Sequence, residues 1–299
     1  MGMELPGINI SIEPIRSYPN ETLAAHILGY LGKISSEYEI QKFVDESNYN
    51  PNDLIGKVGI EGEYESVLRG DNGYRYIEVD AYGRLVKEVE DEYDGLKSVE
   101  PQSGGDIKLT IDLDLQKAAE ESLAKWIPAI QNGGIYEDKW GTVTYEKAEK
   151  AESGAVVVLD VSNGEVLALA NYPTYDPNLF TTGISTEDWD ALSPENARNP
   201  LAPRPLFNTA TLTAVQPGST FKMITGIAAM EQGLDPDRKL DSNGYVEVGN
   251  NIFGCWYWND YHLKHGPTDL YKALEVSCNY YFFNLSMGMD YKTVSYTHL

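Results

Sequence analysis

The stretch GAVVVLDVSNGEVLALANYP, residues 154–173, is the feature that most restricts the fold of this 299-residue chain. Two apolar segments flank Ser162-Asn163-Gly164, a turn sequence that favours the positive φ angles of tight hairpins. The sequence therefore predicts an antiparallel hairpin here. A strand at 107–114 and an amphipathic helix at 115–130 precede it. This helix carries Leu115, Ala118, Ala119, Ser122, Leu123 and Trp126 on one face.

The first hundred residues alternate short strand-like pieces with turns. Their apolar spacing predicts one helix at 23–30, another at 61–68 that ends at Gly70, and a hairpin at 73–89 that turns at 81–83. The segment PQSGGD, residues 101–106, is the best linker candidate by composition. We therefore expect a two-domain α+β protein, with domains at 1–103 and 104–299.

The carboxyl half is expected to combine helices with that hairpin. Residues 131–152 read as an exposed excursion, and helices are predicted at 219–232 and 270–283. No internal repeat or low-complexity segment interrupts this pattern.

The charge balance argues against one class of partner. The chain has 23 Lys and Arg against 46 Asp and Glu, a formal net charge of −23. A surface this acidic repels phosphate backbones, so nucleic acid is not an expected partner. No signal peptide and no apolar run long enough to span a bilayer is found in the sequence.

The thiols and histidines give little sign of a metal. Cys255 and Cys278 are too few for a disulfide framework, and no Cys-x-x-Cys or Cys/His spacing indicates zinc. One disulfide would be compatible with the sequence, but we expect two free thiols. His262 and His265 lie three apart without an acidic pair nearby, so neither a metal nor a cofactor is predicted.

Ser219 and Lys222 form a candidate catalytic pair in AVQPGSTFKMITG. Pro217-Gly218 makes a sharp entry to the predicted helix, which places both side chains on one face of its first turn. A serine hydroxyl becomes a nucleophile when a nearby base takes its proton, and a lysine serves as that base when burial lowers its pKa. The flanking Phe221, Met223 and Ile224 are expected to desolvate the amine.

A capped helix with a surface lysine is the competing interpretation of this spacing. Ser122 and Lys125 have the same spacing in the middle of an amphipathic helix, where we expect an ordinary solvent-facing pair. A second polar motif favours the catalytic interpretation. Ser277-Cys278-Asn279 lies among apolar and aromatic residues, where a buried serine and asparagine need hydrogen-bond partners.

The segments QPGSTFK and SCN resemble the Ser-x-x-Lys and Ser-x-Asn motifs of penicillin-recognising serine enzymes. Four further segments, at 16–32, 56–84, 109–123 and 154–178, are similar to class B penicillin-binding proteins. Among these they most resemble the elongation-type, cell-shape transpeptidases of Gram-positive bacteria. The resemblance runs from about residue 14 to 290 and implies a non-catalytic pedestal of the dimerisation type followed by part of a transpeptidase domain.

The resemblance implies a peptidoglycan D,D-transpeptidase acting on stem peptides, acylated by β-lactams, at the extracytoplasmic face of the cell membrane. Ser219 would attack a D-alanyl carbonyl, with Lys222 as its base. Ser277 would carry a proton to the leaving nitrogen, and Asn279 would orient Lys222 and the substrate amide. A glycosyltransferase or morphogenesis partner would be expected at the pedestal.

The sequence departs from the family pattern in its third motif. No Lys-Ser-Gly or Lys-Thr-Gly is present, and the KTV at 292–294 lacks the glycine. The family's amino-terminal membrane anchor is also missing, and residues from about 294 resemble foreign adapter sequence. We therefore expect a fragment, truncated at both ends, with little or no transpeptidase activity.

Two other functions remain open at the level of sequence. The segment STFK also occurs in class D serine β-lactamases and β-lactam sensors, although the Asn279 position and the long amino-terminal region are unlike them. Residues 1–100 could alternatively act as a non-enzymatic scaffold for a cell-wall synthesis partner.

Overall fold

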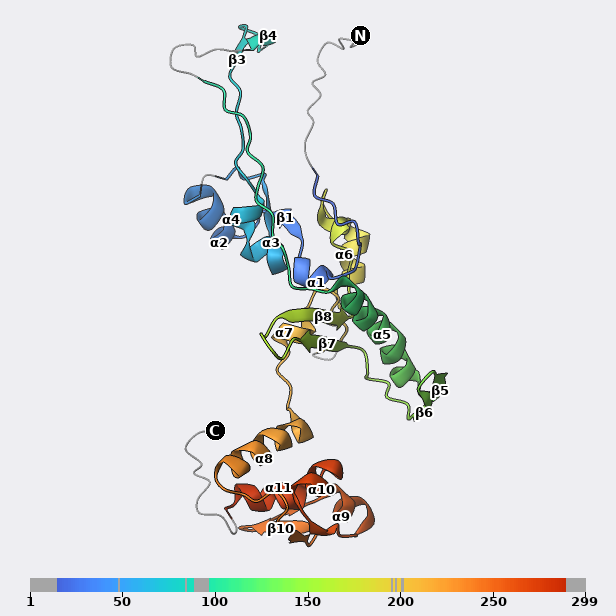
Figure 1. Cartoon of the computed structure of the whole chain (residues 1–299). Coiled ribbons are helices and arrows are strands. Elements are labelled where there is room, and N and C mark those ends of the chain that lie inside the picture. Colours follow the sequence, from blue (N-terminus) through green and yellow to red (C-terminus); the bar gives the residue numbers. More distant parts are fainter. Residues whose placement is uncertain are drawn as a thin grey trace. The chain divides into compact units, whose positions relative to one another are not determined.

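The computed structural model describes residues 15–47, 49–83, 85–88, 97–194, 196, 198–199 and 202–288. The chain divides into two compact units, residues 1–213 and 214–299. Both combine short helices with two-stranded antiparallel sheets (Figure 1). The fold is mixed α+β, as the sequence predicts. The predicted boundary at 103/104 stays a prediction.

The amino-terminal part of the first unit is built on a small sheet and short helices. Strand β1 pairs antiparallel with β2, and the hairpin β3–β4 lies at the far end of two extended segments (Figure 1). The elements are α1 (Ala25–Leu28), β1 (Leu31–Lys33), α2 (Glu37–Glu39), a π-helical turn (Ile40–Asp45), β2 (Leu54–Gly56), α3 (Gly59–Glu63), α4 (Glu65–Leu68), β3 (Ile77–Val79) and β4 (Leu85–Glu88).

The predicted helix at 23–30 is shorter than expected, whereas the predicted helix at 61–68 is two helices, α3 and α4. Helix α1 ends at Gly29, which has a φ of 82°, and a Cβ on this residue would lie 1.8 Å from the carbonyl oxygen of Val58. Only a glycine permits this close approach of α1 to the start of α3. The hairpin at 73–89 is present as predicted.

Two carboxylates of α3 and α4 are buried in this part. Glu61 is 4% exposed and accepts hydrogen bonds from Arg16 Nε at 2.6 Å and Tyr18 Oη at 3.0 Å. Glu65 accepts one from the Gly56 amide at 2.8 Å. Burial raises the pKa of Glu65, while the Gly56 hydrogen bond opposes that rise. These acids fix α3 and α4 against β2 and the segment before α1.

The candidate linker at 101–106 is a paired segment instead. Gln102 exchanges two backbone hydrogen bonds with Asp71, both 2.9 Å long. A Cβ on Gly104 would lie 2.0 Å from the Leu68 carbonyl oxygen, so this glycine packs directly against the end of α4. The glycine composition that suggested a flexible linker is therefore explained by close packing of the backbone.

The rest of the first unit is organised around one long helix and the predicted hairpin. Helix α5 (Leu113–Asn132) packs along β8 (Val166–Tyr172), which pairs antiparallel with β7 (Gly154–Leu159) (Figure 1). Asp112 caps α5 by accepting from the amides of Asp114 and Leu115. The remaining elements are β5 (Gly134–Asp138), β6 (Gly141–Tyr145), a 3-10 turn (Pro177–Phe180), α6 (Thr186–Leu192) and α7 (Thr209–Leu212).

The structure differs from the sequence expectations at two places here. Residues 107–112 form no strand; Asp112 donates one backbone hydrogen bond to Leu167, and α5 begins at Leu113. The segment at 131–152 is mostly exposed, as expected, and it contains the hairpin β5–β6. On the predicted face of α5, Ala119 and Leu123 are buried but Leu115, Ala118 and Ser122 are exposed, and Gln116 is fully buried instead.

Gln116 is buried because its amide completes the backbone of β8. Its Nε2 donates to the Leu169 carbonyl at 2.9 Å and its Oε1 accepts from the Leu169 amide at 2.8 Å. Nε2 also donates to Glu120 at 2.7 Å, and Glu120 accepts from the Ala24 amide. This chain of contacts joins β8, α5 and α1.

The second unit packs three helices over two short sheets. Helix α8 (Phe221–Glu231) contacts α10 (Leu270–Glu275) and α11 (Asn279–Ser286). The other elements are β9 (Leu240–Ser242) paired with β12 (Gly266–Thr268), β10 (Tyr245–Val248) paired with β11 (Asn251–Gly254), and α9 (Trp256–Tyr261). The core consists of Ala229, Leu234, Cys255, Leu270, Ala273, Cys278, Tyr281, Phe282 and Leu285. The predicted helix at 270–283 is therefore two helices.

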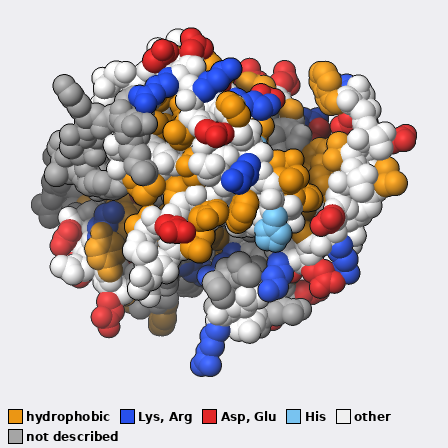
Figure 2. Space-filling view, turned by 90° about the horizontal axis from the view of Figure 1, so that it is seen from below, with side chains coloured by type: hydrophobic (Ala, Val, Ile, Leu, Met, Phe, Trp, Pro, Cys, Tyr) orange, Lys and Arg blue, Asp and Glu red, His pale blue; other side chains and the backbone are white. Residues whose placement is uncertain are grey.

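Hydrophobic side chains are frequent on the surface of the described chain. Figure 2 shows them on one face, interspersed with Lys, Arg, Asp and Glu. On α8, Met223, Ile224 and Ile227 are each more than half exposed.

Replacing Gln116 by alanine is expected to destabilise the first unit by about 2–4 kcal/mol, because it leaves a cavity and unpaired backbone groups on Leu169. The free energy of unfolding from urea titration measures this. Gln131→Ala is the matched control on the same helix, since Gln131 makes one exposed hydrogen bond, to Glu149. Equal effects of the two substitutions would contradict the role given to Gln116.

Candidate active site

Ser219 lies in a 3-10 turn (Gly218–Thr220) immediately before α8. The turn is entered through Gly218, whose φ is 57°, and it is closed by a 2.6 Å hydrogen bond from Thr220 Oγ1 to the Pro217 carbonyl. Neither this turn nor α8 has a side-chain N-cap hydrogen bond. The capped-helix interpretation of Ser219 is therefore wrong, and its exposed hydroxyl is available for other contacts.

Lys222 lies on the first turn of α8, and its amine reaches the segment that joins α10 to α11. Its Nζ donates to the carbonyl oxygen of Ser277 at 2.9 Å, to Ser277 Oγ at 2.9 Å and to Asn279 Oδ1 at 2.5 Å. An ammonium has three N–H groups. All three are matched by acceptors from two residues of one segment.

Ser277 completes the group through its own hydroxyl. Its Oγ donates to Ser219 Oγ at 3.0 Å while it accepts from Lys222. The hydrogen bonds of the described residues thus join Lys222 to Ser219 through Ser277. All four residues singled out from the sequence, Ser219, Lys222, Ser277 and Asn279, lie within one hydrogen-bonded group.

The backbone around Ser277 explains this placement. Ser277 has a φ of 51°, the left-handed conformation. Its amide donates to the Leu274 carbonyl and the Cys278 amide to the Ala273 carbonyl, at 3.2 and 2.8 Å. This is the Schellman arrangement at the end of α10, in which the left-handed position is usually glycine. Here a serine occupies it, and its side chain faces Lys222 and Ser219.

The pKa of Lys222 is lowered from its ordinary value, chiefly because burial disfavours the charged amine. The thiols of Cys255 and Cys278 act in the opposite direction. Phe221, Met223 and Ile224 are each at least 36% exposed. The ring centre of Phe282, which is buried, lies 5.7 Å from Lys222 Nζ.

The second Ser-x-x-Lys sequence, from Ser122 to Lys125, is an ordinary solvent-facing pair, as the sequence predicts. Ser122 Oγ donates to the Ala118 carbonyl of its own helix at 2.6 Å, and both Ser122 and Lys125 are exposed. Lys125 lies over the ring of Trp126, 4.2 Å from its centre. A serine and a lysine at this spacing therefore enter a shared hydrogen-bonded group at 219 and 222, where the Ser277–Asn279 segment supplies acceptors, and do not do so at 122 and 125.

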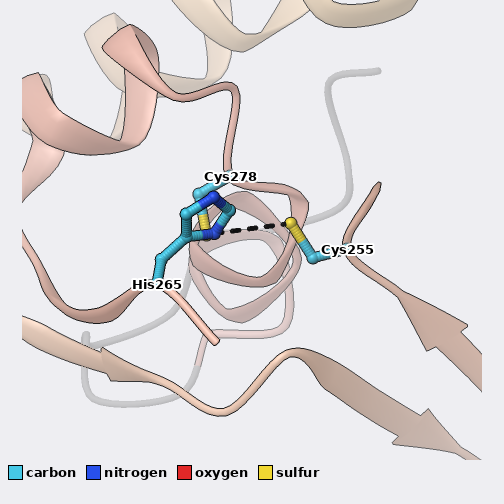
Figure 3. Close-up of side chains that lie close together, drawn as sticks. All are labelled: Cys255, His265 and Cys278. Carbon is cyan, nitrogen blue, oxygen red and sulfur yellow. Dashed lines mark hydrogen bonds between the residues drawn. The ribbon is translucent and has the colours of Figure 1, made fainter. Parts of the chain in front are cut away.

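A cluster of Cys255, His265 and Cys278 lies beside this group (Figure 3). Their Sγ and Nδ1 atoms all lie within 4.8 Å of one another, and Cys255 Sγ is 3.7 Å from His265 Nδ1. Burial raises the pKa of Cys278 and lowers that of His265. Thiolates and imidazoles are donors that zinc accepts, and these three residues each offer one ligand atom, one fewer than the usual four.

Sequence reasoning predicted no metal and did not group these residues. Their spacings, nine and twelve intervening residues, match no local metal motif. They meet because β12 and α10 bring His265 and Cys278 back to the start of α9. The prediction of free thiols is confirmed, since both cysteines are free and buried.

Two protein families match the chain. Residues 1–109 match the Penicillin-binding Protein dimerisation domain, and residues 154–297 match the Penicillin binding protein transpeptidase domain. The second range contains all four residues of the hydrogen-bonded group. The chain belongs to the class B penicillin-binding proteins.

The similarity of the chain to individual penicillin-binding proteins supports its assignment to this family. The chain is 31% identical over 290 residues to the peptidoglycan D,D-transpeptidase MrdA of Acinetobacter baumannii and 30% identical over 289 residues to penicillin-binding protein 3 of Bacillus subtilis. It resembles the structure of a complex between penicillin-binding protein PBP2 and MreC from Helicobacter pylori, with a TM-score of 0.63 and 28% identity. Because both an Acinetobacter and a Bacillus protein match, the particular resemblance to the enzymes of Gram-positive bacteria stays a prediction.

The matches cover most of this chain but less than half of each relative. They span 96% of the chain and 37% and 36% of the Acinetobacter and Bacillus proteins, and 92% of the chain and 43% of the Helicobacter one. Among the helices of the described residues, none is both long and apolar enough to cross a membrane. The KTV and the suspected foreign residues lie outside the described part of the chain.

The two thiols are expected to react slowly with a thiol reagent in the native protein, because both side chains are 0% exposed. In urea, with a chelator present in both samples, two thiols per chain should react, on the order of 100-fold faster. Absorbance of the released reagent measures both rates. Cys255→Ser should leave one thiol, and rapid reaction of two thiols in the native wild type would contradict their burial.

Proposed function

We propose that Ser219 is the acylated nucleophile of a peptidoglycan D,D-transpeptidase that acts in cell-wall elongation and is also acylated by β-lactams. The observation that supports this most directly is the hydrogen-bonded series from Lys222 through Ser277 to Ser219. It places a hydroxyl at the start of a helix within proton-transfer reach of an amine whose pKa is lowered by burial. The substrate class follows from the family.

In the first half-reaction, Ser219 Oγ attacks the carbonyl carbon between the last two D-alanines of a stem peptide. Its proton passes to Ser277 Oγ as Ser277 gives its own proton to the neutral amine of Lys222. When the carbon–nitrogen bond breaks, Ser277 and Lys222 return a proton to the leaving nitrogen, and D-alanine departs. An ester between the stem peptide and Ser219 remains.

In the second half-reaction, an amine of a neighbouring stem attacks this ester. Lys222, acting through Ser277, accepts the amine proton and returns one to Ser219 as the carbon–oxygen bond breaks. A new amide joins the two stems and the serine is regenerated. We assign the backbone N–H of Ser219 to half of the oxyanion hole, an interaction of about 3–4 kcal/mol in acyl-transfer enzymes.

Asn279 is proposed to orient the amine and the substrate. Its Oδ1 already accepts from Lys222, which leaves its side-chain NH₂ free to donate to a substrate amide carbonyl. A second acceptor, the Ser277 carbonyl, restrains the same amine. With two fixed acceptors, Lys222 keeps one N–H directed at Ser277 Oγ, the hydroxyl that contacts Ser219.

We propose that residues 1–103 form a pedestal that binds a cell-wall synthesis partner, and that the whole protein works at the extracytoplasmic face of the membrane. The structure of Helicobacter pylori PBP2 in complex with MreC supports a morphogenesis partner. A glycosyltransferase is the second partner class that the family suggests. Residues 104–299 form the transpeptidase part, in which the given sequence has no Lys-Ser-Gly or Lys-Thr-Gly.

Fluorescent penicillin is expected to label Ser219, because its hydroxyl is linked through Ser277 to the amine of Lys222. Ser219→Ala should abolish the label, and Ser122→Ala should leave it unchanged. Peptide mass spectrometry would locate the ester. Label on another residue, or label that survives Ser219→Ala, would exclude Ser219 as nucleophile, and rapid turnover of nitrocefin would favour a β-lactamase instead.

The labelling rate is expected to rise with pH through the range below the ordinary pKa of a lysine amine. The neutral amine of Lys222 is the base, and burial lowers its pKa, so the neutral fraction increases with pH and reaches half below 10.5. Lys222→Arg should slow labelling by at least about 100-fold, because arginine stays charged. Lys125→Arg is the matched control. A rate that does not change with pH, or an active Lys222→Arg protein, would contradict this assignment.

A further inference from the structure

Two carbonyl groups of the Schellman turn around Ser277 accept hydrogen bonds from side chains of other elements. The last carbonyls of a helix lack intrahelical partners. In this turn the Ser277 carbonyl accepts from Lys222, as described above. The preceding carbonyl, that of Val276, accepts from the indole Nε1 of Trp256 at 2.9 Å. The peptide unit before Ser277 is thereby tied to a residue twenty positions earlier.

Trp256 is well placed to hold that peptide. It is the first residue of α9 and follows Cys255, which is fully buried in the core of the second unit and whose amide donates to the Gly244 carbonyl at 2.7 Å. Its ring also contacts those of Tyr257 and His265, with centres 5.3 and 5.8 Å away. The indole is therefore supported from its backbone and from two neighbouring rings.

The left-handed conformation of Ser277 makes this support necessary. A residue with a side chain pays of order 1–3 kcal/mol to stay in such a region and persists there only when its surroundings hold it. If the Val276–Ser277 peptide turned, Ser277 would relax toward an extended or helical conformation. Its Oγ and its carbonyl would then no longer both face Lys222, and the contact with Ser219 would be lost.

We propose that Trp256 is a positioning residue for the acyl transfer at Ser219. Its indole N–H fixes the Val276 carbonyl and so keeps Ser277 in the conformation that links Lys222 to Ser219. This role rests on the proposed function. Trp256 touches neither substrate nor the reacting atoms and acts through Ser277.

The test compares two tryptophans of the same helix. Trp256→Phe keeps an aromatic ring but removes the indole donor. Trp258→Phe is the matched control, since Trp258 packs against the rings of Tyr245 and His262. Each substitution is made in the full 299-residue chain, alone and together with Ser277→Ala. The readouts are the rate of labelling by fluorescent penicillin, the melting temperature, and the ¹³Cε resonance of Lys222 at one fixed pH.

Trp256→Phe should slow labelling about tenfold, the loss expected for one hydrogen bond, and Trp258→Phe should change it less than twofold. In the Ser277→Ala background, Trp256→Phe should have a much smaller effect on the rate, because the hydroxyl it positions is gone. The Lys222 resonance should shift in Trp256→Phe and stay in place in Trp258→Phe.

Three results would overturn the proposal: an unchanged rate and resonance in Trp256→Phe, equal effects of the two tryptophan substitutions, or the same additional loss with and without Ser277. Each would mean that Trp256 contributes to stability alone. If the wild-type chain is not labelled, the proposed function fails for this chain. The Lys222 resonance then decides the positioning role by itself, since it is recorded without any reaction.

Discussion

The left-handed serine at the end of α10 is the constraint on which the candidate site depends. At this position of a Schellman turn glycine is usual, because it has no Cβ to clash. A serine here costs conformational energy but projects a hydroxyl and a carbonyl toward the same amine. Lys222 binds both, and Ser219 lies one hydrogen bond further. Without the unfavourable φ of Ser277, α8 and the α10–α11 segment would share apolar contacts but no reactive group.

Lys222 experiences two opposed influences from its surroundings. Burial disfavours its charge and lowers its pKa, whereas three oxygen acceptors and two thiols favour the charged form. The hydrogen bonds run from Lys222 to Ser277 to Ser219, which is the direction expected while the lysine is charged. Loss of one proton from the amine lets the direction reverse, so that Ser277 accepts from Ser219. The same contacts can therefore hold the resting state and carry the proton in acylation.

The features that depend on local sequence pattern could be predicted from the sequence. The features that depend on contacts between distant segments could not. The hairpin β7–β8 and the span of α5 follow from alternation, turn residues and helical spacing. Gln116 was missed on the buried face of α5 because its burial depends on Leu169 of another element. The break at Ser277 was missed because a continuous apolar pattern crosses it, and no glycine marks the turn. Cys255, His265 and Cys278 were not grouped because only tertiary folding brings them together.

Cys278 shows how one residue can join the core to the site. It lies between Ser277 and Asn279, yet it is fully buried, packs with Ala273 in the core and has its Sγ 3.3 Å from Ser242 Oγ. Because its position is fixed by packing, the two polar residues beside it have little freedom, and both direct oxygens at Lys222. A larger side chain at 278 would have to displace α10 or α11 and would move both acceptors at once. The apolar middle residue of this motif therefore sets its geometry, while the outer two supply its chemistry.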